Sequence, residues 1–295
     1  MTANENTVEF SLLRLVPTVL RARGFRLYTQ GGRRLVDLWQ NGGAAVLGHT
    51  PPSLLRELKN TASRGLYAPF PHFLETRFIK ALSRLFPNRG FILYASAPAA
   101  LEPLFKTGAA ALWRPFLDSV SPFAVADNAP PILIPVLPGI QGWRNGLPQG
   151  LCVLALVAGY EENCPAQPDS KLPAGEFLSP VLLAAASRGI YDLIAAPDRV
   201  KPVFPRIAKT LQKSPANLCW QRRGIYLSLR EKPNTESWAT LFRHFLDSGF
   251  LIPPIPSQPL ILPGGLSPGE EAKLADALGA GVSPSIDILI SESLV

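Results

Sequence analysis

Residues 23–52 read RGFRLYTQGGRRLVDLWQNGGAAVLGHTPP, and this stretch decides the fold. Apolar and polar residues alternate on both sides of Gly31-Gly32. This predicts two strands joined by a turn, because glycine readily adopts the positive φ angles that such turns need. A second glycine-rich segment follows the hairpin and ends at Pro51-Pro52. The next residues, 53–65, predict a helix that Gly65 closes.

Helical and extended patterns alternate along the rest of the chain. Residues 74–86 (LETRFIKALSRLF) and 236–249 (ESWATLFRHFLDSG) place apolar side chains at helical spacing. Two apolar runs, 131–137 (PILIPVL) and 150–159 (GLCVLALVAG), have the composition of buried parallel strands. Residues 267–270 (SPGE) have the form of a capping box and open a final helix. The alternation predicts an α/β fold.

The charge pattern argues against a nucleic-acid-binding protein. The net charge of +7 comes from 29 basic and 22 acidic residues, and the arginines are scattered, with Arg33-Arg34 and Arg222-Arg223 as adjacent pairs. A nucleic-acid groove concentrates its positive charge on one face. We therefore expect a moderately basic surface, which is also compatible with a shallow pocket for a small anion.

Cysteine use and hydropathy predict a cytoplasmic protein. Cys152, Cys164 and Cys219 are an odd number with no metal-ligand spacing, and each lies in or beside an apolar stretch, as buried free thiols do. The first ten residues are too polar for a secretory signal. The longest apolar stretches fall short of the roughly 18 residues that span a bilayer. We expect no membrane span.

The common catalytic motifs are absent from the sequence. His49, His72 and His244 are too far apart in sequence for a zinc-protease motif. A nucleophile elbow, a P-loop and a dinucleotide-binding fingerprint are also missing. No Asp and Glu cluster suggests a hard-metal site. We therefore predict no metal.

Three segments together resemble class III aminotransferases, the family that includes glutamate-1-semialdehyde aminomutase. Residues 23–52 are similar to the family's N-terminal hairpin and the glycine-rich loop that follows it, and residues 74–86 are similar to its next helix. Residues 222–230, 241–254 and 266–278 look like its C-terminal small domain. The matching positions of the first segment are Gly24, Leu27, Tyr28, Gly32, Arg33, Asp37, Gly43, Leu47, Gly48, His49 and Pro52.

The resemblance implies the fold of pyridoxal-phosphate (PLP) enzymes of fold type I. It implies a small domain made from residues 1–70 and 202–295, and a large cofactor domain, reduced in size, with a parallel or mixed sheet, from residues 71–201. Class III enzymes are substantially longer than this chain, and the shortening falls in the large domain. Fold type I proteins generally dimerise. The resemblance therefore implies a homodimer or a complex with an intact paralogous aminotransferase subunit.

The family's phosphate-binding turn matches residues 94–100, YASAPAA. In the family this turn is rich in Gly, Ser and Thr and leads into a helix N-terminus, where free N–H groups bind the phosphate. Ser96 is kept here, and Ala97, Pro98 and Ala99 replace the Gly, Thr and Glu positions. Proline has no N–H to donate. Ser96 and Ala97 are the candidate phosphate-binding residues.

The ring carboxylate and the Schiff-base lysine that transamination requires are hard to place. The resemblance implies an Asp at the end of the strand at 150–159. The nearest acidic residues after this strand are Glu161 and Glu162. Lys171 is the candidate lysine between Lys106 and Lys201, and it lies in a proline-rich loop with no preceding strand pattern.

Three hypotheses follow. The first, which we favour, is an aminotransferase-like protein that has lost transamination, a pseudoenzyme that serves as a binding or partner subunit. The second is an active PLP-dependent aminotransferase or aminomutase that acts on a small amino acid or amino-aldehyde through Lys171 or Lys201. The third is an unrelated enzyme or a nucleic-acid-binding module that uses the arginines.

Overall fold

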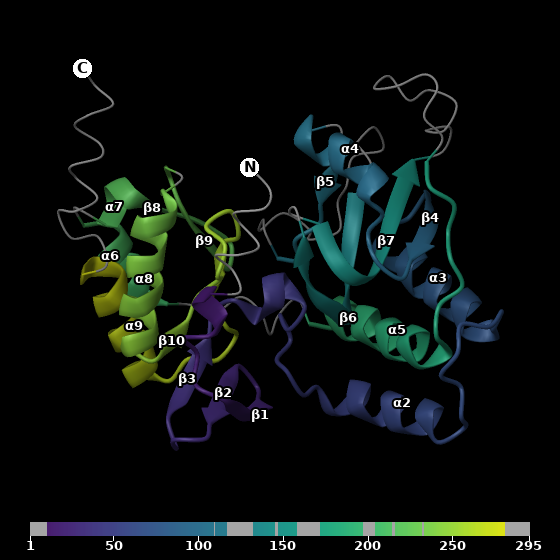
Figure 1. The fold of residues 1–295 in the computed structure, drawn as a ribbon, viewed down its shortest axis with the longest axis horizontal. Coiled ribbons are helices and arrows are strands. Elements are labelled where there is room, and N and C mark those ends of the chain that lie inside the picture. Colours follow the sequence, from purple (N-terminus) through teal and green to yellow (C-terminus); the bar gives the residue numbers. More distant parts are fainter. Residues whose placement is uncertain are drawn as a thin grey trace. The chain divides into compact units, whose positions relative to one another are not determined.

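The computed structural model describes residues 11–108, 110–116, 132–144, 147–157, 172–196, 204–213, 216–231 and 233–280. The chain divides into two compact units (Figure 1). The terminal unit comprises Met1–Gly42 and Asp198–Val295, and the central unit comprises Gly43–Pro197. Each unit combines helices with β-sheet, so the predicted α/β class is confirmed. Within the described ranges, no helix is long and apolar enough to cross a membrane.

The first sheet of the terminal unit contains the hairpin that the sequence predicts. Strands β1 (Val19–Arg23), β2 (Arg26–Thr29) and β3 (Arg34–Asp37) pair antiparallel in that order. Gly32 has a φ of 74° in the β2–β3 turn, where a side chain would be strained. The short strand β10 (Phe250–Leu251) then pairs parallel with β3. Both ends of the chain therefore contribute to one sheet.

The second sheet of the terminal unit is antiparallel, in the order β11-β9-β8. Its strands are β8 (Trp220–Arg223), β9 (Tyr226–Leu229) and β11 (Leu260–Ile261). Residues 222–230 span the end of β8 and the whole of β9, and the chain reverses between these strands at Gly224, which has a φ of 58°.

The described part of the terminal unit also contains helices α6 (Pro205–Leu211), α7 (Ala216–Cys219), α8 (Thr235–Asp247) and α9 (Pro268–Ala280). Helix α8 begins at Asn234, whose side chain accepts a hydrogen bond from the Ser237 N–H at 2.8 Å. Its predicted apolar face is buried, namely Trp238, Leu241, Phe242, Phe245 and Leu246. Helix α9 packs against α6.

The central unit contains one four-stranded sheet in the order β4-β7-β6-β5. Its strands are β4 (Arg89–Tyr94), β5 (Ala111–Leu112), β6 (Ile132–Arg144) and β7 (Leu147–Val157). Its helices are α2 (Pro52–Ala62), α3 (Phe73–Leu85), the short α4 (Glu102–Lys106) and α5 (Pro180–Ile194). Helix α5 packs against α2, α3 and β6, and Figure 1 shows it between α2 and the sheet.

The two apolar runs of the central unit pair antiparallel, which corrects the expectation of parallel strands. Leu133 of β6 is opposite Leu154 of β7, and Arg144 is opposite Leu147. Strand β4 is also antiparallel to β7, whereas β5 and β6 are parallel. The runs look like parallel strands because β7 is buried almost throughout, and a strand covered on both faces loses the apolar–polar alternation.

The observed division places residues 43–70 in the central unit, whereas the resemblance assigned residues 1–70 to the small domain. Helix α2 lies in this segment and packs on α5. The Ser53 hydroxyl donates a hydrogen bond to the Asp192 carboxylate at 2.5 Å, which joins the beginning of α2 to the end of α5. The second boundary lies between Pro197 and Asp198.

Candidate functional site

The turn that follows β4 is the candidate phosphate site. Strand β4 ends at Tyr94, and Ser96 and Ala97 follow as the sequence predicts. The Ser96 hydroxyl donates to Gln149 Oε1 at 3.3 Å, and the Ala97 N–H donates to the Pro148 carbonyl at 3.2 Å. Both acceptors belong to the first residues of β7. The turn is therefore held against the adjacent strand.

An extended segment crosses the edge of the sheet beside this turn. We call residues 172–179 the strap. The Glu176 N–H donates to the Leu93 carbonyl at 2.9 Å, so the strap hydrogen-bonds to β4, the edge strand. A Cβ atom at Gly175 would lie 3.3 Å from Ile92 Cγ2 and 3.4 Å from the Leu93 carbonyl oxygen. A glycine is thus what allows the strap to lie this close to β4.

The strap places a carboxylate on the candidate phosphate turn. Glu176 Oε2 accepts a hydrogen bond from the Ala95 N–H at 2.7 Å. Glu176 could not be singled out from the sequence, because it lies in a proline-rich stretch without periodicity. The Glu176 carboxylate also affects the pKa of the buried Cys152 of β7. Burial first, and then the negative charge of Glu176, raise the pKa of the Cys152 thiol to about 12.

This arrangement does not fit a phosphate group. The Ala95 N–H already bonds to a carboxylate, the Ala97 N–H bonds to a carbonyl, and Pro98 has no N–H. A dianionic phosphate at the turn would also be repelled by Glu176. The helix after the turn does not compensate, because α4 is only five residues long. The residues that would hold the phosphate of PLP are engaged within the protein.

The sheet register shows which end of β7 lies beside this turn. Tyr94 is opposite Cys152, and Arg89, at the other end of β4, is opposite Val157. At about 3.4 Å per residue, the two ends of β4 are roughly 17 Å apart. Glu161 and Glu162 lie outside the described residues, and the strand that leads toward them ends at Val157, at the end of β4 far from Ser96.

The candidate lysine also lies outside the described residues, as does Lys201. The residues that follow Lys171 are described. Leu172 packs against the buried cluster that contains Tyr94 and Leu101, and the Tyr94 hydroxyl donates to the Pro173 carbonyl at 2.8 Å. The chain directly after Lys171 therefore lies at the same end of the sheet as Ser96. Among the described residues, no group of three or more His, Cys, Asp or Glu side chains could hold a metal ion.

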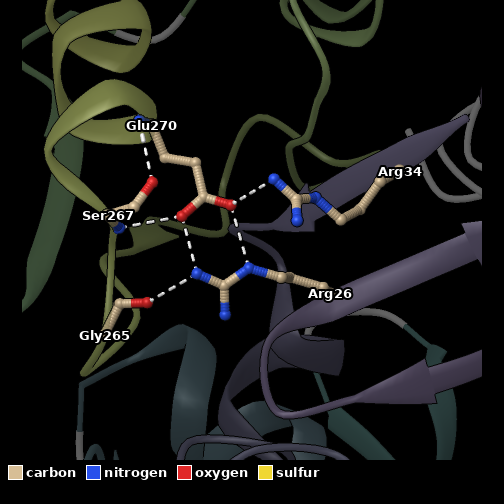
Figure 2. Close-up of polar contacts among 5 residues, drawn as sticks. All are labelled: Arg26, Arg34, Gly265, Ser267 and Glu270. Atoms are coloured by element: carbon tan, nitrogen blue, oxygen red, sulfur yellow. Dashed lines mark hydrogen bonds and ion pairs between the residues drawn. The ribbon is translucent and has the colours of Figure 1, made fainter.

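A network of charged side chains lies in the terminal unit (Figure 2). Glu270, in the first turn of α9, forms a bidentate pair with Arg26 of β2, with distances of 2.9 Å and 2.6 Å. Arg34 of β3 approaches the same carboxylate at 3.2 Å. The Ser267 N–H donates to Glu270 at 2.8 Å, and the Ser267 hydroxyl accepts from the Glu270 N–H at 3.3 Å, which is the predicted capping box.

This network is structural. The hydrogen bonds from Arg26 lower the pKa of Glu270 to about 2, although burial by itself would raise it. Arg26 also donates to the Gly265 carbonyl at 3.1 Å. The network joins the N-terminal hairpin to the C-terminal helix, which are the two segments that the sequence resemblance identified. Both carboxylate oxygens of Glu270 are used within the unit.

Comparison with known proteins supports the sequence resemblance. No family model matches the chain. An uncharacterised protein of Treponema pallidum is 26% identical over 301 aligned positions, which cover 85% of this chain and 91% of that protein. Glutamate-1-semialdehyde 2,1-aminomutase of Sorangium cellulosum is 33% identical over 70 residues, 24% of this chain and 16% of the aminomutase.

Solved structures extend the likeness to most of the chain. Acetylornithine aminotransferase from Elizabethkingia anophelis superposes with a TM-score of 0.60 at 12% identity, over 90% of this chain and 93% of that one. Ornithine δ-aminotransferase of Plasmodium falciparum gives a TM-score of 0.59 at 12% identity, over 90% and 92%. The expectation of a fold type I architecture is confirmed. The chain has the fold of PLP-dependent aminotransferases, as its hairpin and C-terminal helices predict.

Proposed function

We propose that this chain is an aminotransferase-like protein that has lost transamination and acts as a non-catalytic binding or partner subunit. One observation carries the proposal: the Glu176 carboxylate accepts the Ala95 N–H in the turn where a cofactor phosphate would bind. Two further features support it. The Ala97 N–H donates to the Pro148 carbonyl, and the last described residue of β7, Val157, lies at the end of β4 far from Ser96.

The proposed partner is a second copy of the chain or an intact paralogous aminotransferase. The support is the likeness in fold to aminotransferases, together with the dimer that the family resemblance implies. A small anion at the turn is not supported, because Glu176 brings negative charge to it. A cytoplasmic location agrees with Cys152 and Cys219, which are buried and form no disulfide with another described residue.

A second candidate function is an active PLP enzyme with Lys171 as the Schiff-base residue. It is favoured by the position of Leu172 and Pro173, which are held beside Tyr94 at the end of the sheet where Ser96 lies. This candidate requires Glu176 to leave the turn when the cofactor enters.

Borohydride trapping separates the two candidates. The purified chain is incubated with PLP and reduced with sodium borohydride, and peptide mass spectrometry identifies the modified lysines. We expect Lys171 to be labelled no more than the exposed lysines of α6 and α9, for example Lys209 and Lys273. The Lys171→Arg variant should therefore keep the same total labelling. Stoichiometric labelling of Lys171 that is lost in Lys171→Arg would contradict the proposed loss of catalysis, and so would stoichiometric labelling of Lys201.

A further inference from the structure

A cavity of about 350 Å³ lies between α3, β4 and the strap in the central unit. Glu75 and Ile79 of α3, Phe91 and Ile92 of β4, and Glu176 and Phe177 of the strap line it. The volume is in the range of small-molecule sites, which is roughly 300–1,000 Å³. The cavity is too small for a folded partner. Its volume suits a small organic molecule.

The lining carries negative charge without a balancing cation. Glu75 and Glu176 line the cavity, and none of its described lining residues is Lys, Arg or His. In the described part of the chain, the Glu75 carboxylate forms no ion pair, and Glu176 uses Oε2 for the Ala95 N–H. Two carboxylates beside one cavity create a local negative potential that a cation would relieve.

The rest of the lining is apolar and aromatic. Phe91, Ile92 and Ile79 are half-buried, and Phe177 is 58% exposed. Exposed phenylalanine costs free energy in water, and its ring face attracts cations. A hydrated metal ion would gain nothing from these side chains, because Mg²⁺ and Ca²⁺ prefer oxygen ligands in larger number. The lining instead suits a ligand with a charged end and an apolar body.

We propose that this cavity binds a small organic cation, with an ammonium group beside Glu75 and Glu176 and an apolar body against Phe91 and Phe177. The proposal names the ligand chemistry for the binding role described above. Its biological meaning rests on the proposed function. The binding itself can be tested independently, because the experiment below measures ligand binding directly. A failure of this test leaves the lysine-trapping result unchanged, and the two proposals can fail separately.

Three matched probes test the charge requirement. The full chain is titrated by calorimetry with 2-phenylethylamine, with 2-phenylethanol and with phenylacetate, which share an aromatic body and differ in charge. We expect the amine to bind at least about tenfold more tightly than the alcohol, since a tenfold change corresponds to about 1.4 kcal/mol. We expect no binding of phenylacetate. Equal affinity for the three probes, or no binding of the amine at millimolar concentration, would overturn the proposal.

Two variants test the location of the site. Glu75→Gln and Glu176→Gln should each weaken amine binding about fivefold, the factor expected for one partly exposed charge pair. Glu236→Gln is the control, because Glu236 is an exposed first-turn residue of α8 in the other unit. Both test positions lie outside the buried core, and circular dichroism verifies that the variants fold. Unchanged affinity in both folded variants would place the amine elsewhere and refute the site.

Discussion

Glu270→Gln is the substitution that most sharply tests how the terminal unit is held together. The change removes the charge of Glu270 and keeps an oxygen that can accept from the Ser267 N–H and from Arg26. The capping box therefore survives in part. What is lost is the bidentate charged pair with Arg26, at 2.6 Å and 2.9 Å, and the ion pair with Arg34 at 3.2 Å.

The magnitude follows from the pKa of the carboxyl group. A pKa lowered from 4.5 to about 2 corresponds to about 3 kcal/mol in favour of the charged form in the folded state. Solvent screening reduces this, because the side chains of Arg26 and Arg34 are 26% and 52% exposed. We therefore expect Glu270→Gln to lower the free energy of unfolding by about 1–2 kcal/mol at pH 7.

The sign of the pH dependence is fixed by the direction of the shift. A carboxyl group whose pKa is depressed on folding contributes stability that is complete above its unfolded pKa of about 4.5. That stability is lost as the pH falls through about 2. The difference between wild type and Glu270→Gln should therefore be constant from pH 7 to about pH 5 and shrink progressively toward pH 2.

Urea unfolding followed by tryptophan fluorescence measures this difference, because Trp220 and Trp238 are buried in the terminal unit. The matched control is Glu236→Gln, which removes one exposed carboxylate and should change the free energy of unfolding by less than about 0.5 kcal/mol. Equal stability of Glu270→Gln and wild type at pH 7, or a difference that persists undiminished at pH 2, would refute the electrostatic explanation.

Two further predictions concern groups that the fold engages internally. Glu271 Oε1 accepts from the Arg206 and Ile207 N–H groups at 2.7 Å and 3.4 Å and so caps α6. Glu271→Ala should cost about 1 kcal/mol in urea unfolding, and Glu271→Gln, which keeps an acceptor, should cost less; equal losses would contradict the capping role. The Cys152 thiol is fully buried and its pKa is raised to about 12. Native protein at pH 8 should leave Cys152 unalkylated by iodoacetamide, with labelling only in urea, as read by peptide mass spectrometry; rapid native labelling would contradict its burial.

The parts of the fold that the sequence predicts are those set by neighbouring residues. The β2–β3 hairpin follows from the alternation on both sides of Gly32, and the buried face of α8 follows from helical spacing. The capping box at Ser267 and Glu270 could also be predicted from the sequence. The partner of Glu270 was not, because Arg26 is 244 residues away in the sequence. A local pattern carries no information on which distant side chain completes it.

The antiparallel orientation of β6 and β7 could have been predicted from the sequence. Asn145-Gly146 separates the two apolar runs, and this dipeptide is the strongest short hairpin signal. Arg144 and Leu147, on either side of it, are paired across β6 and β7. The antiparallel pairing was therefore predictable from this turn, whereas uniform burial of the runs suggested parallel strands.

The candidate site was half predictable. The sequence located the turn at Ser96 and Ala97 and showed that the family's Gly, Thr and Glu positions were replaced there. The carboxylate that occupies the turn could not be predicted, because Glu176 reaches Ala95 only through the strap, which has no periodic pattern. The role of Gly175, whose lack of a side chain leaves room for the strap beside β4, could be recognised only once the contact between the strap and β4 was known.

Titration of the ¹⁵N-labelled chain with inorganic phosphate and then with PLP tests the central claim most directly. The amide signals of Ala95 and Ala97 report on two N–H groups of the candidate phosphate turn that are hydrogen-bonded within the protein. We expect both signals to stay in place at phosphate and PLP concentrations that saturate ordinary phosphate sites, because Glu176 and Pro148 already accept these hydrogen bonds. A saturable shift of both amides in the wild-type chain would show that the turn still binds phosphate and would contradict the account.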